Sequence, residues 1–151
     1  QKTSYDISLG LGGSEMCIRD SLRTEGNPDG HLVLRGGKSG PNYDEQSVKL
    51  AQNDLSDGGL PANLVVDCSH GNSNKDHERQ PSVFEDVVGQ RVSGNAGVVG
   101  VMLESHINPG SQSLGDDPSE LDYGVSITDA CVGWEKTEEI ILWADEQLNS
   151  N

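Results

Sequence analysis

Three short apolar runs, each followed at once by a polar or glycine-rich loop, constrain this sequence more than any other feature. The runs span residues 32–34, 64–66 and 98–103. Apolar runs of this length that end in turn residues are typical of strands buried on both faces, as in parallel sheets. Because α/β folds bind their ligands at the carboxyl ends of such strands, we expect a functional site in the three loops.

A helical pattern follows each of these runs. Asp44 is placed to cap the first helix, which Gly58 and Gly59 would end in a left-handed turn. The second helix is expected to begin at Pro81 and the third near Thr137. The inward-facing residues of the three patterns are Val48, Ala51 and Leu55, then Phe84, Val88 and Val92, then Ile140, Ala144 and Leu148.

The resulting order, β-α-β-α-β-loop-α, predicts an α/β fold with parallel strands and right-handed crossovers. A length of 151 residues is typical of one domain. Three strands cannot close a barrel, and an eight-stranded (β/α)8 barrel takes about 250 residues. The chain is therefore either a small open sheet or part of a larger fold.

Charge and cysteine content narrow the class of protein. The net charge is -15, with 25 acidic and 10 basic residues, which argues against nucleic acid or an anionic membrane as the main partner. A small phosphorylated substrate needs only a local basic pocket. No apolar run approaches the length of a membrane span. The three cysteines, Cys17, Cys68 and Cys131, form no CxxC pair, which favours a reduced cytoplasmic protein.

Residues 1–21 differ in character from the rest of the chain. They contain no basic segment followed by an apolar one, so they do not read as a signal peptide. Residues 12–21 look like translated adapter sequence. We therefore expect residues 1–21 to be a non-native or disordered leader and native sequence to begin near Leu22.

An anion site is one interpretation of the loop after the first run. Arg35 stands at the strand end, and Gly36 and Gly37 let backbone amides approach an anion. Arginine binds phosphate or carboxylate through a bidentate fork. This is not a Walker A loop, because Leu32 stands where that motif needs glycine. An ordinary tight turn beside a surface ion pair explains the pattern equally well.

A metal site is one interpretation of the other two loops. Glu104 directly follows an apolar strand, where a carboxylate is costly unless it is paired or bound to metal. His70 alone is most simply a histidine bonded within a turn, but with Glu104 and Asp129 it makes a possible ligand set. Imidazole and carboxylate ligands together suit Mn, Fe, Co or Zn. Cys68 and Cys131 are expected to be buried small residues and not ligands.

Taken together, these segments resemble the type I 3-deoxy-D-arabino-heptulosonate 7-phosphate (DAHP) synthases, also called phospho-2-dehydro-3-deoxyheptonate aldolases. The resemblance covers about residues 22–151. It rests on six ordered motifs: HLVLRGGK (31–38), GPNY (40–43), DCSHGNS (67–73), GVMLESH (100–106), GSQSL (110–114) and YGVSITDACVGW (123–134).

The resemblance implies that residues 22–151 are the C-terminal part, about three βα units, of a (β/α)8 barrel. The family condenses phosphoenolpyruvate with erythrose 4-phosphate and water, giving DAHP and phosphate in the first step of the shikimate pathway. It uses a divalent metal, and a homo-oligomer is expected for the parent protein. By the same resemblance Arg35 binds phosphoenolpyruvate, and His70, Glu104 and Asp129 are three of four metal ligands. His70 and Asp129 are then expected to be catalytic as well.

Two features of the family are absent from this sequence. The fourth metal ligand is a cysteine from the first half of the barrel, and the Lys-Pro-Arg-Thr motif holds erythrose 4-phosphate. Cys68 lies two residues before His70, but it does not correspond to the family's cysteine ligand. We therefore expect the 151-residue chain to be inactive alone. The alternatives are another metal-dependent phosphosugar synthase or aldolase on the same barrel, or a non-catalytic remnant that associates with a complete subunit.

Overall fold

The computed structural model describes residue 27 and residues 29–150. The chain divides into two units, Gln1–Gly30 and His31–Asn151, and the described helices and strands lie in the second. The expected leader at residues 1–21, and Cys17 within it, lie outside the described residues.

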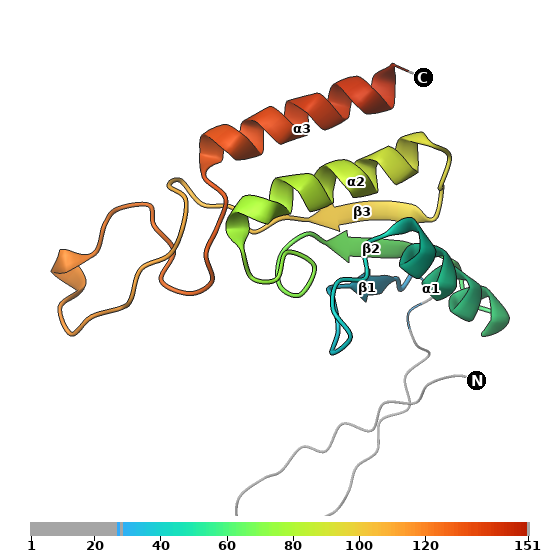
Figure 1. Cartoon of the computed structure of the whole chain (residues 1–151), viewed down its shortest axis with the longest axis horizontal. Helices are drawn as coiled ribbons and strands as arrows, with labels where there is room; N and C mark the ends of the chain where they lie inside the picture. Colours follow the sequence, from blue (N-terminus) through green and yellow to red (C-terminus); the bar gives the residue numbers. More distant parts are fainter. Residues whose placement is uncertain (1–26, 28, 151) are drawn as a thin grey trace, which may run out of the picture. The chain divides into compact units, whose positions relative to one another are not determined.

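The second unit is an α/β structure built on a three-stranded parallel sheet with the strand order β1-β2-β3 (Figure 1). The elements are β1 (Leu32–Leu34), α1 (Glu45–Asp57), β2 (Leu64–Asp67), the 3-10 helix η1 (His77–Arg79), α2 (Gln80–Val92), β3 (Val98–Met102), the 3-10 helix η2 (Pro118–Glu120) and α3 (Trp134–Asn149). The predicted alternation of strands and helices is confirmed.

The two ends of α1 follow the predicted capping chemistry. The backbone N–H of Ser47 donates to Asp44 Oδ1 over 3.0 Å, and the Ser47 hydroxyl donates to Asp44 Oδ2 over 2.6 Å. These bonds hold the pKa of the Asp44 carboxyl below its usual range. At the other end Gly59 has φ +70°, and Leu60 N–H donates to the carbonyl of Leu55. This left-handed turn is the glycine-terminated cap that the sequence predicts.

The last helix differs from the prediction. It begins at Trp134, three residues before Thr137, because Gly133 is the N-cap and Thr137 N–H donates to its carbonyl as an ordinary helical bond. Ile140 and Ala144 are buried as predicted, but Leu148 is 48% exposed. Leu148 lies in the final turn of α3, so the predicted inward position there is wrong.

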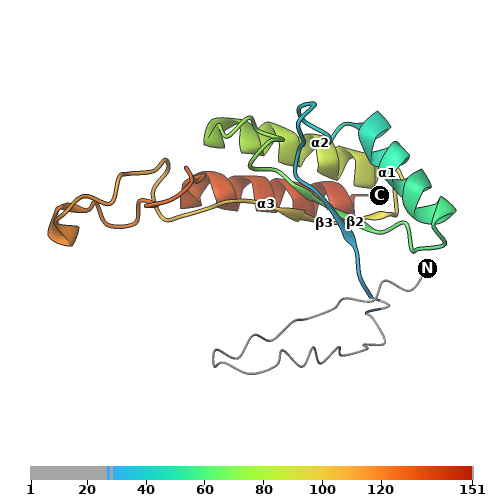
Figure 2. The ribbon, with the colours of Figure 1, turned by 90° about the horizontal axis from the view of Figure 1, so that it is seen from below.

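The core packs between the sheet and its helices. It joins the buried residues Leu34, Val48, Leu64, Val66, Cys68, Val83, Phe84, Val87, Val88, Val98, Ile140 and Ala144. Helices α2 and α3 contact each other, and Figure 2 shows them side by side. Val33 pairs with Val65, and Val65 pairs with Gly100. These residues lie on the face of the sheet that points away from the core, and Val33 is 39% exposed there.

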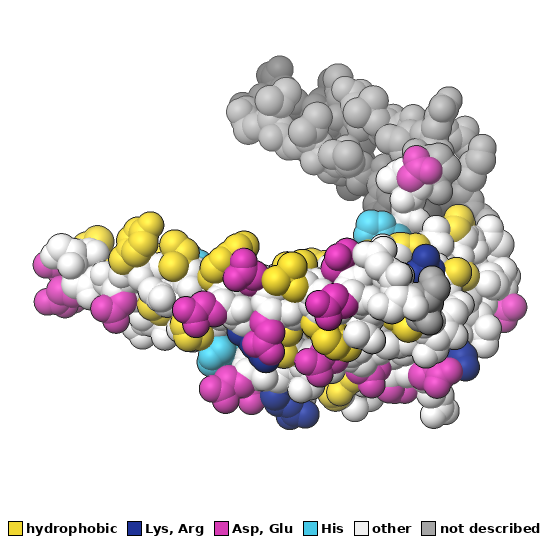
Figure 3. Space-filling model, turned by 90° about the horizontal axis from the view of Figure 1, so that it is seen from above, with side chains coloured by type: hydrophobic (Ala, Val, Ile, Leu, Met, Phe, Trp, Pro, Cys, Tyr) yellow, Lys and Arg dark blue, Asp and Glu magenta, His cyan; other side chains and the backbone are white. Residues whose placement is uncertain are grey.

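The surface agrees with the acidic composition. Figure 3 shows Asp and Glu side chains spread over the face it displays, with apolar side chains between them and few basic ones. None of the described helices is both long and apolar enough to cross a membrane.

Truncating the centre of this core should destabilise the fold. Leu64 on the middle strand is fully buried, so Leu64→Ala is expected to lower the free energy of unfolding by about 2–5 kcal/mol. Leu50→Ala removes the same atoms from a side chain that is 62% exposed. It should change the free energy of unfolding by no more than about 0.5 kcal/mol. Urea unfolding followed by circular dichroism measures both values. Equal losses in the two variants would contradict the core assignment.

Candidate metal and anion site

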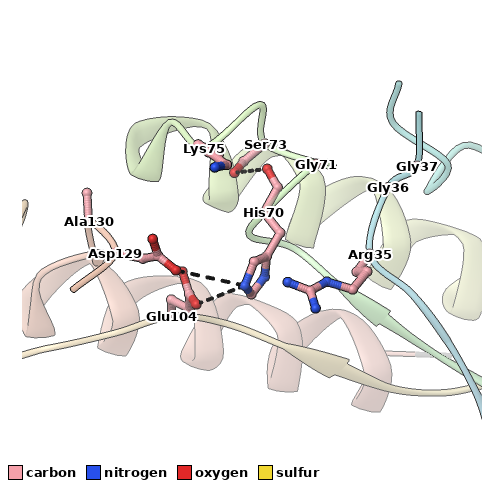
Figure 4. Close-up of a pocket in the computed structure, with 10 residues that line it drawn as sticks. All are labelled: Arg35, Gly36, Gly37, His70, Gly71, Ser73, Lys75, Glu104, Asp129 and Ala130. Atoms are coloured by element: carbon pink, nitrogen blue, oxygen red, sulfur yellow. Dashed lines mark hydrogen bonds and ion pairs between the residues drawn. The ribbon is translucent and has the colours of Figure 1, made fainter. Parts of the chain in front are cut away.

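The loops after the three strands meet around one cavity. Its volume is about 460 Å³. The sequence-predicted residues Arg35, His70, Glu104 and Asp129 all line it, together with Gly36, Gly37, Gly71, Ser73, Lys75 and Ala130 (Figure 4). Parallel strands place their carboxyl ends at one edge of the sheet, which is why segments far apart in sequence converge here.

His70 stands three residues after the end of β2. Its backbone has φ +50°, a left-handed conformation unusual for histidine. Ring atom Nδ1 lies 2.8 Å from Asp67 Oδ2 and 2.7 Å from Ser69 Oγ. Both partners are buried, whereas the His70 side chain is 27% exposed. One edge of the ring is therefore held by the protein, and the other faces the cavity.

Glu104 and Asp129 come from the two ends of the loop after β3. Glu104 N–H donates to Oε1 of Gln80, a buried residue at the start of α2. Val132 N–H donates to the Glu104 carbonyl over 2.9 Å, and Ser105 forms a parallel bridge with Val132. This pairing brings the Asp129 segment back beside the end of β3.

The three side chains form a group that fits a divalent ion. His70 Nε2 lies 3.5 Å from Glu104 Oε1 and 4.0 Å from Asp129 Oδ2, and one ligand atom from each residue lies within 4.8 Å of the others. Two tetrahedral ligands that are each about 2.1 Å from an ion stand about 3.4 Å apart. One imidazole and two carboxylates are a donor set for Mn, Fe, Co or Zn. A cation also offsets the repulsion between two neighbouring carboxylates.

Positive side chains border the same cavity. The Arg35 guanidinium points toward the His70 ring from the β1 side, opposite the two carboxylates (Figure 4). Lys75 is exposed and lines the cavity from the loop after β2, where its backbone has φ +62°. A guanidinium and an ammonium beside a candidate metal site suit a small anionic substrate.

A relay of two asparagines joins the loops that carry Arg35 and His70. Asn72 is buried, and its amide NH2 donates to the carbonyls of Leu34 and Asp67, the last residues of β1 and β2. Its Oδ1 accepts from Asn42 N–H over 2.8 Å, and Asn42 Oδ1 accepts from Gly36 N–H over 2.7 Å. The relay satisfies backbone groups that the sheet leaves unpaired and sets the spacing of the two loops.

Close packing of two glycines reinforces that spacing. Gly36 has φ +80°, and a Cβ atom there would lie 2.6 Å from the Cα of Gly71. Gly71 N–H donates to the Arg35 carbonyl over 3.1 Å. No residue with a side chain fits at Gly36 unless the backbone moves. The sequence pattern assigns this glycine a role in anion binding, and the structure shows that it also lets the two loops pack against each other.

Cys68 and Cys131 are free thiols, and neither joins the candidate metal group. Burial, with the charge of Asp67 as a lesser cause, raises the pKa of the Cys68 thiol to about 12. Cys68 is thus a buried small residue, as predicted. The predicted burial of Cys131 is wrong, because this residue lies in the long loop after β3, outside the core, and is only partly buried. Sequence reasoning missed the roles of Asp67, Asn72 and Gln80. The role of Asp67 could have been found, because this aspartate ends an apolar strand three residues before a histidine.

The sequence matches known proteins along most of its length. The profile of the DAHP synthetase I family matches residues 4–141. The Tyr-sensitive phospho-2-dehydro-3-deoxyheptonate aldolase of Enterobacter agglomerans is 52% identical over 134 residues, which are 89% of this chain and 61% of that protein. The Tyr-sensitive enzyme of Escherichia coli is 50% identical over 128 residues, which are 85% of this chain and 36% of that one.

The fold matches a solved structure as well. The phospho-2-dehydro-3-deoxyheptonate aldolase of Francisella tularensis superposes with a TM-score of 0.81 at 36% sequence identity. The match covers 97% of this chain and 42% of that one. The chain thus spans 61% of the length of the Enterobacter agglomerans relative and less than half of the length of the other two.

The glycine contact gives a sharp test of how the site is held. Gly36→Ala is expected to lower the free energy of unfolding by about 1–2 kcal/mol from its backbone conformation alone, and further from the contact with Gly71. Gly37→Ala is the matched control, because its Cβ would meet nothing within 4 Å, and it should change the value by no more than about 0.5 kcal/mol. Urea unfolding measures both. An unchanged Gly36→Ala stability would contradict the close packing.

Proposed function

The chain belongs to the DAHP synthetase I family, and from that premise we propose that its site serves the condensation of phosphoenolpyruvate with erythrose 4-phosphate and water. The products are DAHP and phosphate, in the first step of the shikimate pathway to the aromatic amino acids. The observation that carries the proposal is the group His70, Glu104 and Asp129 beside Arg35 in one cavity. The names of the relatives favour this reaction over another phosphosugar condensation.

The fold supports two statements about architecture, a general one and a more specific one. The parallel βα arrangement is that of part of an α/β enzyme of this family. The finer proposal is that residues 22–151 are about three βα units of a (β/α)8 barrel. The match to the solved relative takes in 97% of this chain but only 42% of the relative. This is the coverage expected if the chain is one part of a larger barrel.

The divalent ion would be held by His70 Nε2, Glu104 and Asp129, whose ligand atoms already face one another. Mn, Fe, Co and Zn all suit these donors. When bound, such an ion supplies Lewis-acid polarisation of the erythrose 4-phosphate aldehyde. His70 and Asp129 are the proposed catalytic residues, and with Glu104 they would hold the ion beside the reacting carbonyl.

Arg35 orients the other substrate. Its guanidinium fork can bind the phosphate or the carboxylate of phosphoenolpyruvate in two parallel hydrogen bonds. The Arg35 guanidinium lines the same cavity as the metal group and points toward the His70 ring, so phosphoenolpyruvate bound to it would lie beside that group. Holding the two substrates at fixed separation lowers the entropic cost of their reaction.

We further propose that this chain is inactive alone, that it is cytoplasmic, and that the parent protein is a homo-oligomer. The sequence holds neither the family's cysteine ligand nor its Lys-Pro-Arg-Thr motif. Cys68 is a poor substitute, because burial raises its pKa to about 12 and so disfavours the thiolate that binds metal. The free thiols Cys68 and Cys131 suit a reducing compartment.

Metal binding tests the proposed ligands directly. His70→Ala should weaken Mn²⁺ binding by more than the roughly 10–100-fold that removal of an outer partner costs, because it removes a ligand. His31→Ala removes an exposed imidazole outside the cavity and should bind as the wild type does. Isothermal titration with Mn²⁺ measures both. Equal affinity in the two variants would argue against the site.

A chimera tests the activity. The C-terminal part of the Escherichia coli relative is replaced by residues 22–151 of this chain, and phosphate release is followed with both substrates and Mn²⁺. We expect the chimera to release phosphate and its His70→Ala variant to release far less. The isolated chain should release none. A folded but inactive chimera would contradict the proposed function, and robust turnover by the isolated chain would contradict the proposed inactivity.

A further inference from the structure

We propose that Asp67 and Ser69 are positioning residues, which hold the His70 ring with its proton on Nδ1 and its Nε2 lone pair toward Glu104 and Asp129. The inference deepens the proposed function, since it rests on the metal site at His70. It assigns a role to a buried carboxylate that the proposed reaction itself does not use.

Asp67 is buried and fully engaged. It is 2% exposed and ends β2. Its Oδ1 accepts the Ser69 N–H over 2.9 Å and the Ser69 hydroxyl over 2.5 Å, while its Oδ2 lies 2.8 Å from His70 Nδ1. Among the described residues, His70 is the one ion-pair partner of Asp67. Burying a carboxylate is costly unless it is bonded in this way, so the arrangement depends on the histidine.

Counting protons identifies the tautomer. The Ser69 hydroxyl has one proton, and at 2.5 Å it gives that proton to Asp67 Oδ1. Toward His70, 2.7 Å away, Ser69 Oγ can then only accept. An ionised Asp67 can also only accept. Nδ1 must therefore be the donor to both. A neutral imidazole carries one N–H, so in the neutral ring this proton sits on Nδ1 and Nε2 is the unprotonated nitrogen.

This tautomer determines what Nε2, on the side of the ring that faces the cavity, can bind. Nε2 lies 3.5 Å from Glu104 Oε1 and 4.0 Å from Asp129 Oδ2. An unprotonated Nε2 cannot donate to these carboxylates, so its lone pair is free for a cation between them. Carboxylates that bond the far nitrogen of a metal-ligating histidine fix its orientation and increase its basicity.

A purely structural role for Asp67 makes a different prediction. Asp67 could simply close the turn through Ser69 N–H, as Asp76 closes the start of η1 by accepting Glu78 N–H over 3.0 Å. Asp67→Asn would then leave the His70 tautomer and the affinity for Mn²⁺ unchanged, as Asp76→Asn should. Asp76 is exposed and its carboxylate has no bond to a histidine ring among the described residues, which makes Asp76→Asn the matched control for Asp67→Asn.

The test is long-range ¹H–¹⁵N NMR of the metal-free full chain, labelled at histidine and measured where the rings are neutral. We expect the His70 ring to be protonated at Nδ1 in the wild type and in Asp76→Asn. In Asp67→Asn the new amide NH2 faces Nδ1 and turns it into an acceptor, so the proton should move to Nε2. Isothermal titration with Mn²⁺ should then show about 10–100-fold weaker binding in Asp67→Asn only.

Each outcome is decisive. A wild-type His70 protonated at Nε2 overturns the proposal, and this spectrum alone decides it if Asp67→Asn fails to fold. An Asp67→Asn variant with the wild-type tautomer and affinity also overturns it, as would an equal loss of affinity in Asp76→Asn. A wild type that carries the proton on Nδ1 but binds no Mn²⁺ supports the positioning role and contradicts the metal site instead.

Discussion

The buried side chain of Asn72 is the contact on which the arrangement of the site depends. Its amide bonds the last carbonyls of β1 and β2 and the backbone of Asn42, so one residue joins two strand ends to the loop between them. Strand ends leave backbone groups without ladder partners, and a buried amide supplies two donors and an acceptor. With the contact between Gly36 and Gly71, this bonding sets how far the Arg35 loop stands from the His70 loop.

The metal group shows how the same sheet collects ligands from distant segments. His70 and Glu104 follow neighbouring parallel strands, so the fold brings them together directly. Asp129 arrives through the pairing of Ser105 with Val132, after a long loop. Of the three side chains Asp129 is the most exposed, at 67%, which fits a ligand supplied by a returning loop and not by a strand end.

Much of this could be predicted from the sequence, because short apolar strands and capped helices are local patterns. The predicted burial on both faces is wrong for β1 and β3, where Val33 is 39% and Val99 is 53% exposed, because the helices pack their buried residues into one core cluster. Asp44 and Gly59 act as their types predict, since capping involves residues a few positions apart. The end of α3 was misjudged, because periodicity alone cannot tell where a helix extends beyond its packing partner. Leu148 keeps the spacing of Ile140 and Ala144, but the core ends before it.

The sequence by itself determined the order of elements, the family and the four side chains Arg35, His70, Glu104 and Asp129 as candidates. Only the tertiary structure decided that these side chains face one cavity, and that Asp67, Asn72 and Gln80 hold the loops behind them. The physical reason is that a residue type limits which bonds a side chain can make, whereas its partners are set by which strand ends the fold brings together.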